Sequence, residues 1–508
     1  MHTTGTLQQL DHAHLWHPFT PMKQWRETPP LVIERGDGPY LFDTEGNRYI
    51  DGTSSLWCNI HGHRHPMIDA AVRDQLDKVA HSTLLGLTNP PAIEFTAKLV
   101  ECINRRQPRP YPKDGQVRAT SPTPHLLNKV FLSDAGATAV EAAFKMAVGY
   151  WYHHGKPEKN RFLGLEGAYH GDTVGSMSVG YSPLFHKPFV SMVFDIDTFP
   201  APDALRPPEA IAQHKPPRSP QISSVGKWPS EDPNLQQQLL DHSITALEHH
   251  LQHHADTTAA IVIEPVMQGA AGMVCQPAGF LNAVGRLARK HNVLLICDEV
   301  AVGFGRTGSM FAFEHELDRP NETDGFHGPD ILCLAKGISA GYLPLAATVT
   351  TDAIEHAFTG ELHEKKTLFH GHTYTGNPLA CAAGLASLDL FGEPTHDSPN
   401  LLTHINASAD LIRTKLDALR GHPHILDIRQ RGLMTGIELG TRQPDGSAAP
   451  FDFSKRTGYA ICDHLRTQGL IIRPLGDVLV LMPIPATPHS VLEELLDQVV
   501  QTLLDWDF

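Results

Sequence analysis

The stretch Val293-Leu294-Leu295-Ile296-Cys297-Asp298 is an apolar run that ends in a carboxylate, and Ile331-Leu332-Cys333-Leu334-Ala335-Lys336 is a second run that ends in an amine. Short runs of this kind predict strands buried on both faces of a parallel sheet. An acid and a lysine at two such strand ends are typical of a pyridoxal phosphate (PLP) site. The lysine bonds to the cofactor aldehyde and the acid keeps the pyridine nitrogen protonated. Lys336 and Asp298 are therefore the candidate catalytic pair.

Each of these two residues also has an ordinary structural interpretation, because a strand-end aspartate usually caps a turn and a strand-end lysine usually extends to solvent. The surrounding pattern favours a site. Residues 259–263 predict a strand and residues 280–291 a helix, which with the next strand form a right-handed βαβ unit. Ligands bind outside the carboxyl ends of such strands, so we expect Glu264, Asp298 and Lys336 to converge.

A candidate phosphate site lies in Ser133-Asp134-Ala135-Gly136-Ala137-Thr138, between a predicted strand and a predicted helix. Free N–H groups at a helix N-terminus favour an anion, and Gly136 and Ala137 would let a phosphate approach. An ordinary capped helix is the alternative. Tyr169 in the turn Tyr169-His170-Gly171 could stack on a planar cofactor, although most such tyrosines are surface or core residues.

Composition limits the class of protein. The 508 residues include 41 Lys+Arg and 56 Asp+Glu, a net charge of −15, which disfavours nucleic acid and anionic membranes as partners. The 7 cysteines form no C-x-x-C pair, which fits a reducing compartment. No apolar run is long enough to span a membrane. We expect a cytoplasmic protein that acts on small molecules.

The chain is expected to divide into three parts, because alternating strands and helices in its middle give way to a different pattern near residue 390. Residues 1–60 would join a small domain, 61–390 would form a large PLP-binding domain, and 391–508 would form the C-terminal small domain. Two stretches, 107–125 and 201–238, have the proline-rich composition of surface excursions or loops.

The motifs resemble those of the class III aminotransferases. The segments that carry the resemblance are Asp298-Glu299-Val300, Gly303-Phe304-Gly305-Arg306-Thr307-Gly308 and Pro329-Asp330-Ile331 through Lys336-Gly337. That family implies an α/β protein of PLP-dependent transferase fold type I. It would have a large domain with a mostly parallel central sheet between helices and a smaller α/β domain from both termini. It also implies homodimers with active sites shared between subunits.

Within this family the chain resembles the enzymes of biotin biosynthesis that convert 8-amino-7-oxononanoate to 7,8-diaminononanoate. The segments concerned are Leu15-Trp16-His17-Pro18-Phe19-Thr20, Ser54-Ser55-Leu56-Trp57, Ile60-His61-Gly62-His63, Tyr169-His170-Gly171-Asp172, Phe369 through Pro378, and Ile472-Arg473-Pro474. S-adenosylmethionine would be the amino donor.

The resemblance implies a role for each matching residue. The implied catalytic residues are Lys336, Asp298 and Tyr169. Cofactor binding is implied for Gly136, Ala137, Tyr169, Asp298 and Lys336, together with His372 and Thr373 of the partner subunit. Substrate binding is implied for Phe19, Leu56, Trp57, Tyr169, Lys336, Gly371 and Arg473, and no metal ligand is implied. Arg473 offers a planar fork that matches the substrate carboxylate, and Lys336 can move the proton once it is released, which predicts ping-pong kinetics.

Three positions depart from the family pattern: Phe19 replaces a tyrosine, Leu56 replaces the first of two adjacent tryptophans, and His372 replaces a proline. Some relatives with this phenylalanine and single tryptophan use lysine as the donor, so lysine stays open beside S-adenosylmethionine. Another class III ω-amino acid or diamine aminotransferase is a further alternative.

Two rival classes of function rest on weaker patterns. Gly303 to Gly308 fits G-x-G-x-x-G, with Asp324 about 20 residues later, as in NAD-dependent dehydrogenases, but only a short helix is expected after it. His61, His63 and His65 could serve a metal hydrolase, yet no carboxylate accompanies them closely and Pro66 ends the run in a turn.

Overall fold

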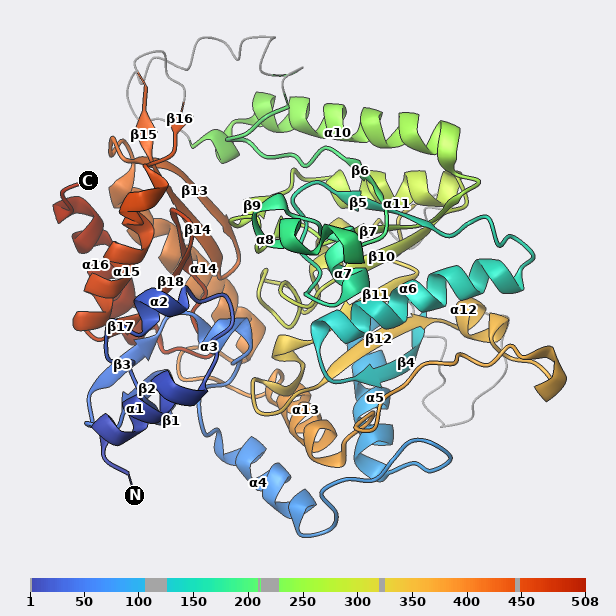
Figure 1. Ribbon diagram of the computed structural model, residues 1–508, viewed down its shortest axis with the longest axis horizontal. Coiled ribbons are helices and arrows are strands. Elements are labelled where there is room, and N and C mark those ends of the chain that lie inside the picture. Colours follow the sequence, from blue (N-terminus) through green and yellow to red (C-terminus); the bar gives the residue numbers. More distant parts are fainter. Residues whose placement is uncertain (1, 106–125, 209–210, 212–227, 319–324, 444–447) are drawn as a thin grey trace.

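The central feature of the computed structural model, which describes residues 2–105, 126–208, 211, 228–318, 325–443 and 448–508, is a seven-stranded sheet. Its strands are β4 (Leu127–Ser133), β5 (Arg161–Leu165), β6 (Asp197–Phe199), β7 (Thr258–Ile263), β10 (Leu294–Asp298), β11 (Ile331–Leu334) and β12 (Ala346–Thr351). They lie in the order β4-β12-β11-β10-β7-β5-β6 (Figure 1). β12 is antiparallel to both neighbours, whereas β11, β10, β7, β5 and β6 pair in parallel. The predicted mostly parallel α/β sheet is confirmed.

Helices cover both faces of this sheet, which explains why its strands are apolar throughout. Helix α6 (Gly136–His153) packs on one face, where Phe144 meets a core that includes Ile296. Helices α5 (Pro90–Ile103), α11 (Phe280–Lys290) and α13 (Pro378–Leu390) cover the other face, and their side chains share a core with Leu295. Successive residues of β10 thus face opposite cores, as the period of two in a strand requires.

The two ends of the chain share a second sheet, in the order β1-β2-β3-β17. Its strands are β1 (Ile33–Asp37), β2 (Tyr40–Asp43), β3 (Arg48–Asp51) and β17 (Leu470–Ile471). Ile50 of β3 pairs in parallel with Leu470 of β17, so strands more than 400 residues apart in sequence lie side by side (Figure 1).

A third sheet lies in the C-terminal part, beside the first strands in Figure 1. Its order is β13-β14-β19-β18, with β13 (Ile425–Arg431), β14 (Met434–Leu439), β18 (Arg473–Leu475) and β19 (Val478–Leu481). The helices of this part are α14 (Leu401–Leu416), α15 (Thr457–Thr467) and α16 (His489–Asp505). Each of them contributes a fully buried aliphatic side chain to the common core: Ile405, Ile461 and Leu496.

The remaining helices are short connections around these sheets. They are α1 (Thr4–His14), α2 (Met22–Trp25), α3 (Ser54–Trp57), α4 (Pro66–Leu76), α7 (Val174–Val179), α8 (Pro183–His186) and α12 (Asp352–Ala357). The small strand pairs are β8 (Met267–Gln268) with β9 (Val274–Cys275), and β15 (Thr441–Arg442) with β16 (Ala448–Ala449). Among the described residues, no helix combines the length and the apolar character needed to cross a membrane.

The prediction of an irregular stretch over 201–238 is wrong at its C-terminal end. Helix α10 (Pro233–His254) begins there, after a 3-10 turn over Pro229–Glu231. Asp232 caps the helix by accepting hydrogen bonds from the N–H groups of Asn234 and Leu235. The predicted excursion over 107–125 and residues 209–210 and 212–227 lie outside the described residues.

Candidate active site

A cavity of about 710 Å³ lies at the carboxyl ends of the central strands. Parallel pairing of β7, β10 and β11 brings Glu264, Asp298 and Lys336 into its wall, because each residue ends or closely follows one of these strands. Of the other predicted site residues, Trp57, Gly136, Ala137 and Tyr169 also line this cavity. Parts of the sequence that are far apart therefore meet at one place.

Lys336 follows β11 in a left-handed backbone conformation, with a φ of 47°. Its Nζ lies 4.9 Å from the centroid of the Trp57 ring. Burial lowers the pKa of the Lys336 amine, although the charges of Asp298 and Glu264 oppose the shift. A lower pKa keeps more of the amine neutral near pH 7, and the neutral amine is the form that attacks an aldehyde.

Asp298 is held in place by His170, which the sequence analysis quoted within a motif but gave no role. Its Oδ2 accepts a hydrogen bond of 2.7 Å from His170 Nδ1, and its Oδ1 accepts one of 3.0 Å from the Val300 N–H. Burial alone would lower the pKa of His170, but the hydrogen bond and the charge of Asp298 raise it overall. A protonated His170 would place a positive charge beside the Asp298 carboxylate. The useful signal in the sequence was a histidine within a turn at a strand end.

Small residues pack closely around the helix N-terminus at Gly136, which lines the cavity. A Cβ on Gly136 would lie 2.7 Å from Val300, and one on Gly171, where φ is 119°, would lie 2.5 Å from the Cβ of Ala137. Neither position can take a larger side chain without a shift of its surroundings. Because α6 begins at the cavity wall, its first turn, whose N–H groups have no partner within the helix, is a suitable place for an anion.

Tyr169 and Glu264 both line the cavity and are joined by a hydrogen bond. Its N–H donates to Glu264 Oε2 at 3.2 Å, the Gly269 N–H donates to Glu264 Oε1 at 2.9 Å, and the Tyr169 hydroxyl donates to Asp172 at 2.7 Å. Burial raises the pKa of the Glu264 carboxyl to about 7. Burial and the bond to Asp172 also raise the pKa of the Tyr169 phenol well above its usual range.

The other predicted site residues do not line the cavity: Phe19, Leu56, Gly371, His372, Thr373 and Arg473. Phe19 and Leu56 are 56% and 53% exposed, and Gly371, Thr373 and Arg473 are exposed as well. His372 lies beside the cavity, with its Nε2 3.9 Å from the carboxylate of Asp134, which is in the cavity wall.

The two rival patterns have other roles in this fold. The segment from Gly303 to Gly308 forms turns followed by a 3-10 helix over Ala312–Glu316, so within the described residues up to 318 no helix of the length a dinucleotide requires follows it. In the histidine run, His61 Nε2 lies 3.0 Å from Ser387 Oγ, whereas His63 Nε2 lies 3.0 Å from Asp51 Oδ2. These rings have different partners and share no metal-ligand arrangement.

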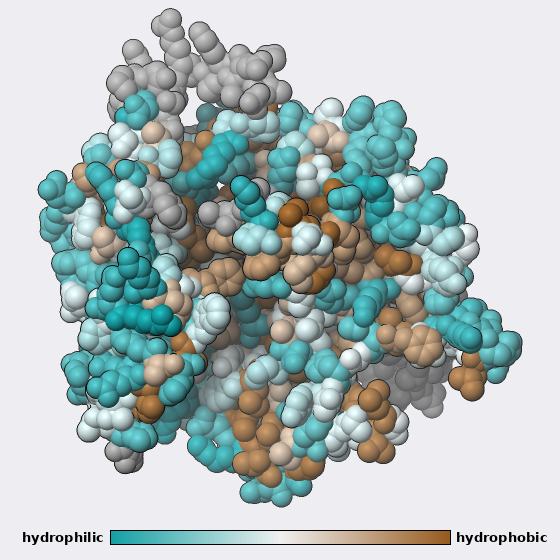
Figure 2. Space-filling view, in the orientation of Figure 1, coloured by the Kyte–Doolittle hydropathy of each residue, from teal (hydrophilic) through white to brown (hydrophobic). Residues whose placement is uncertain are grey.

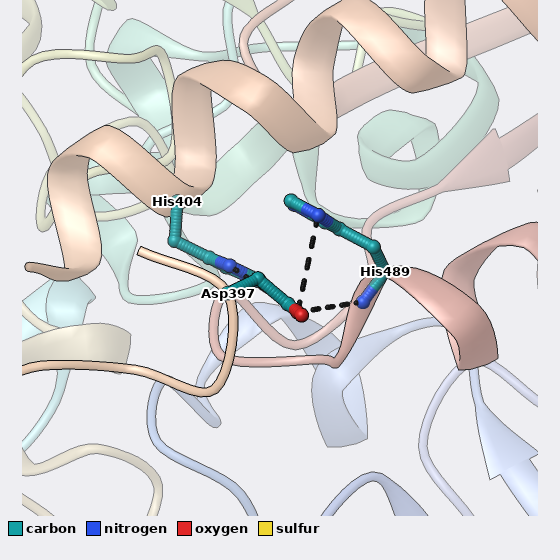
Figure 3. A group of neighbouring side chains, drawn as sticks. All are labelled: Asp397, His404 and His489. Atoms are coloured by element: carbon teal, nitrogen blue, oxygen red, sulfur yellow. Dashed lines mark hydrogen bonds and ion pairs between the residues drawn. The ribbon is translucent and has the colours of Figure 1, made fainter. Parts of the chain in front are cut away.

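A second group of ligand-type side chains, Asp397, His404 and His489, lies outside the cavity (Figure 3). Asp397 Oδ2 lies 3.8 Å from His404 Nδ1 and 3.9 Å from His489 Nδ1. The two imidazoles are stacked, with centroids 4.4 Å apart and planes 5° from parallel. Because a ligating imidazole directs its lone pair within its ring plane, no one ion position suits both stacked rings. The His489 N–H donates to Asp397 at 3.0 Å, so this group holds the start of α16.

Comparison with known proteins identifies the family. The sequence model of the family described as aminotransferase class-III matches residues 22–505 of this chain. The chain belongs to the class III aminotransferase family. It is 43% identical over 504 residues to the adenosylmethionine-8-amino-7-oxononanoate aminotransferase of Nitratidesulfovibrio vulgaris, covering 98% of this chain and 81% of the relative. Its identity to the enzyme of the same description from Geobacter sulfurreducens is 42%, covering 98% and 97%. The chain is therefore an aminotransferase.

Solved structures agree with this assignment. The crystal structure of adenosylmethionine-8-amino-7-oxononanoate aminotransferase from Methanocaldococcus jannaschii has a TM-score of 0.82 and 36% identity, covering 99% of this chain and 100% of that chain. An (S)-enantioselective ω-transaminase from Thermomicrobium roseum has a TM-score of 0.81 and 30% identity, covering 99% of both chains. A PLP-bound amine transaminase from a Pseudomonas species is also similar, with a TM-score of 0.81 and 29% identity, covering 97% of this chain and 98% of that chain. Both the fold type and the dependence on PLP follow from the family.

The residues of the cavity fit this cofactor. Lys336 supplies an amine whose pKa is lowered by burial, and Asp298 supplies a carboxylate that His170 orients from the side. The small residues at the start of α6 leave its N–H groups open to a phosphate. Amine, acid and anion site all line the same cavity.

Proposed function

We propose that this aminotransferase converts 8-amino-7-oxononanoate to 7,8-diaminononanoate in biotin biosynthesis, with S-adenosylmethionine as the amino donor. The observation that carries the proposal is the convergence of Lys336, Asp298 and the start of α6 on one cavity. The similarity to enzymes of that description over 98% of the chain supports the choice of substrate.

In the proposed mechanism the residues of the chain bind, orient and move protons. PLP, when bound, supplies an electron sink for negative charge on the substrate carbon. Lys336 would hold the cofactor and then carry a proton on Nζ between substrate and cofactor carbons. Asp298 would keep the ring nitrogen protonated, and Gly136 and Ala137 would bind the phosphate. Tyr169 would cover one face of the ring from the cavity wall.

The donor has a second candidate, lysine, because Phe19 and Leu56 replace a hydroxyl-bearing and a larger aromatic side chain of the family pattern. Both positions are expected to face the amino donor, so the lost hydroxyl and the smaller apolar wall keep lysine open beside S-adenosylmethionine. Arg473 would bind the carboxylate of the acceptor, which this change does not affect.

We further propose a homodimer that shares its active sites, with His372 and Thr373 of the partner subunit reaching the phosphate. Large apolar side chains remain exposed in the single chain, and such patches mark contact surfaces. Phe185, Phe189, Val190 and Met192 gather over and after α8, in the centre of the face drawn in Figure 2. Leu85 and Phe369 are each 78% exposed.

We also propose the division into residues 1–60, 61–390 and 391–508, which the sheet shared by the two termini supports, and a cytoplasmic location, which would suit the biosynthetic role. The decisive experiment is an amino-transfer assay with 8-amino-7-oxononanoate as acceptor and S-adenosylmethionine and lysine offered separately. Formation of 7,8-diaminononanoate with S-adenosylmethionine supports the proposal. Turnover with lysine alone would assign the second donor, and no turnover with either would refute the proposed acceptor.

A further inference from the structure

Four successive residues beside the cavity have a left-handed backbone. Ser54, Ser55, Leu56 and Trp57 have φ angles of 50°, 48°, 69° and 70°. None is a glycine, and L-residues rarely adopt this conformation, least of all in succession. Surrounding contacts must therefore hold this segment, which we call the left-handed turn.

The left-handed turn places Trp57 in the cavity wall. The Trp57 N–H donates to the Thr53 carbonyl at 2.8 Å, which closes the turn. On one side the indole faces Lys336, whose Nζ lies 4.9 Å from the ring centroid. On the other side it packs against Gly269, where an added Cβ would lie 3.2 Å from Trp57 Cζ3. The position of this ring thus sets the space available to a substrate next to Lys336.

Asp51 is the residue that ties the left-handed turn together. It is 1% exposed at the end of β3. Its Oδ1 accepts from the N–H groups of Ser55 at 3.0 Å and Thr53 at 3.3 Å. Its Oδ2 accepts from the Ser55 hydroxyl at 2.7 Å and from His63 Nε2 at 3.0 Å. Burial alone would raise the pKa of Asp51, but the bonds from His63 and Ser55 lower it, so the group stays ionised.

Arg306 holds the same segment from the opposite side. Its guanidinium, 1% exposed, donates to Ser54 Oγ at 3.1 Å and to the carbonyls of Asn59 and Pro483, both at 2.9 Å. Within the left-handed turn these bonds reach only Ser54, and the Asn59 carbonyl lies just after the turn. The conformation of the middle of the turn therefore depends on Asp51.

We propose that Asp51, oriented by His63, is a positioning residue that fixes the Trp57 ring against Lys336 and so determines how tightly the amino donor binds. This inference rests on the amino-transfer site proposed above, but not on the identity of its donor or acceptor. Asp51 lines no part of the cavity, so it would act only through the left-handed turn.

The first test compares D51N and W57F, singly and together, in the half-reaction with whichever amino donor the wild-type enzyme uses. D51N should raise the KM for the donor about tenfold with a smaller loss of kcat, because one buried acceptor is lost. In the W57F background, the same change should alter KM by less than about twofold, because Trp57 is the route by which Asp51 acts. Equal losses in both backgrounds would overturn the proposal.

Asp43 offers a matched control. It is 6% exposed at the end of β2 and accepts from the N–H groups of Glu45 and Asn47, both at 2.9 Å, in the turn before β3. D43N removes a comparable buried acceptor whose partners lie outside the left-handed turn. It should lower Tm as D51N does and leave KM unchanged. A rise in KM with D43N of the size seen with D51N would reduce the role of Asp51 to general stability.

A second measurement requires no activity. The chain has 6 tryptophans, and the fluorescence that is lost in W57F is the signal of Trp57 alone. In the protein without cofactor, acrylamide quenching of this signal reports how exposed Trp57 is. D51N should increase this quenching and D43N should not. Unchanged quenching in D51N would refute the positioning role even if the proposed substrates prove wrong, whereas increased quenching without turnover of those substrates would refute only the proposed function.

Discussion

The side chains at the ends of the central strands and those proposed to contact substrate from outside the cavity differ in how exposed they are. Glu264 and Asp298 are buried, and backbone N–H groups and His170 bind their carboxylates. The other side chains form an exposed group: Phe19, Leu56, Gly371, Thr373 and Arg473. The difference teaches that the sheet determines the cofactor chemistry, while substrate choice is left to segments that can vary without disturbing the core.

The largest expected loss of activity comes from replacing Lys336 in the group at the strand ends. K336A removes the only group proposed to bond to the cofactor and to carry the proton, so kcat should fall by about 10⁴-fold or more. Steady-state amino transfer measures the loss. K129A serves as the control and should keep full activity, because Lys129 lies on β4 with its Nζ 3.3 Å from Asp352, outside the cavity. Substantial turnover by K336A would contradict the proposed site.

The next effect concerns the partner acid. D298N keeps the shape of the side chain but loses the charge that favours a protonated ring nitrogen, so kcat should fall by about 10³-fold. D330N is a suitable control, because Asp330 accepts from the Leu295 N–H at 2.8 Å at the opposite end of β11. If both variants lose the same activity, the effect of D298N is structural.

The third prediction uses pH to test how much the buried Glu264 carboxylate, when ionised, lowers the free energy of unfolding. Its pKa is raised to about 7 from the ordinary value of 4.5, so the folded state binds the proton more tightly than the unfolded state. Stability should therefore fall as pH rises from 4.5 to 7 and then level off, by about 3 kcal/mol in total.

E264Q cannot ionise, so its Tm should change less than that of the wild type over this pH range. The variant should be less stable at low pH, because a glutamine amide cannot accept from both the Tyr169 and Gly269 N–H groups through separate oxygens. Thermal unfolding followed by fluorescence at several pH values gives the comparison. Curves of the same shape for both proteins would show that Glu264 does not titrate there.

The smallest expected loss of activity comes from changing Arg473 in the exposed group. R473A should raise the KM for the keto-acid acceptor by about 30-fold, the value of one charge-assisted pair, and leave the donor half-reaction unchanged. R48A tests for a general effect of charge, because Arg48 stacks over Tyr40 at 4.6 Å in the N-terminal sheet. An equal change in both half-reactions would remove Arg473 from acceptor recognition.

The sequence alone was sufficient for the central sheet and for the residues at its edge. Apolar runs that end in Glu264, Asp298 and Lys336 predicted parallel strands with polar ends on one side, and the structure has them there. The helix after Gly136 was equally predictable from small residues followed by helical spacing. These features depend on local periodicity and on the rule that ligands bind outside the carboxyl ends of parallel strands, so a single sequence determines them.

Only the tertiary structure decided the contacts that cross between distant segments. The bond from His170 to Asp298, the pairing of β3 with β17, and the bond from Arg306 to Ser54 in the left-handed turn depend on partners far away in the chain. Helix α10 was missed in part because its polar first turn, capped by Asp232, continues a proline-rich stretch. Local sequence is enough to favour a strand or a helix. A strained turn and a buried ion pair, however, form only where the folded chain supplies their hydrogen-bond donors and acceptors.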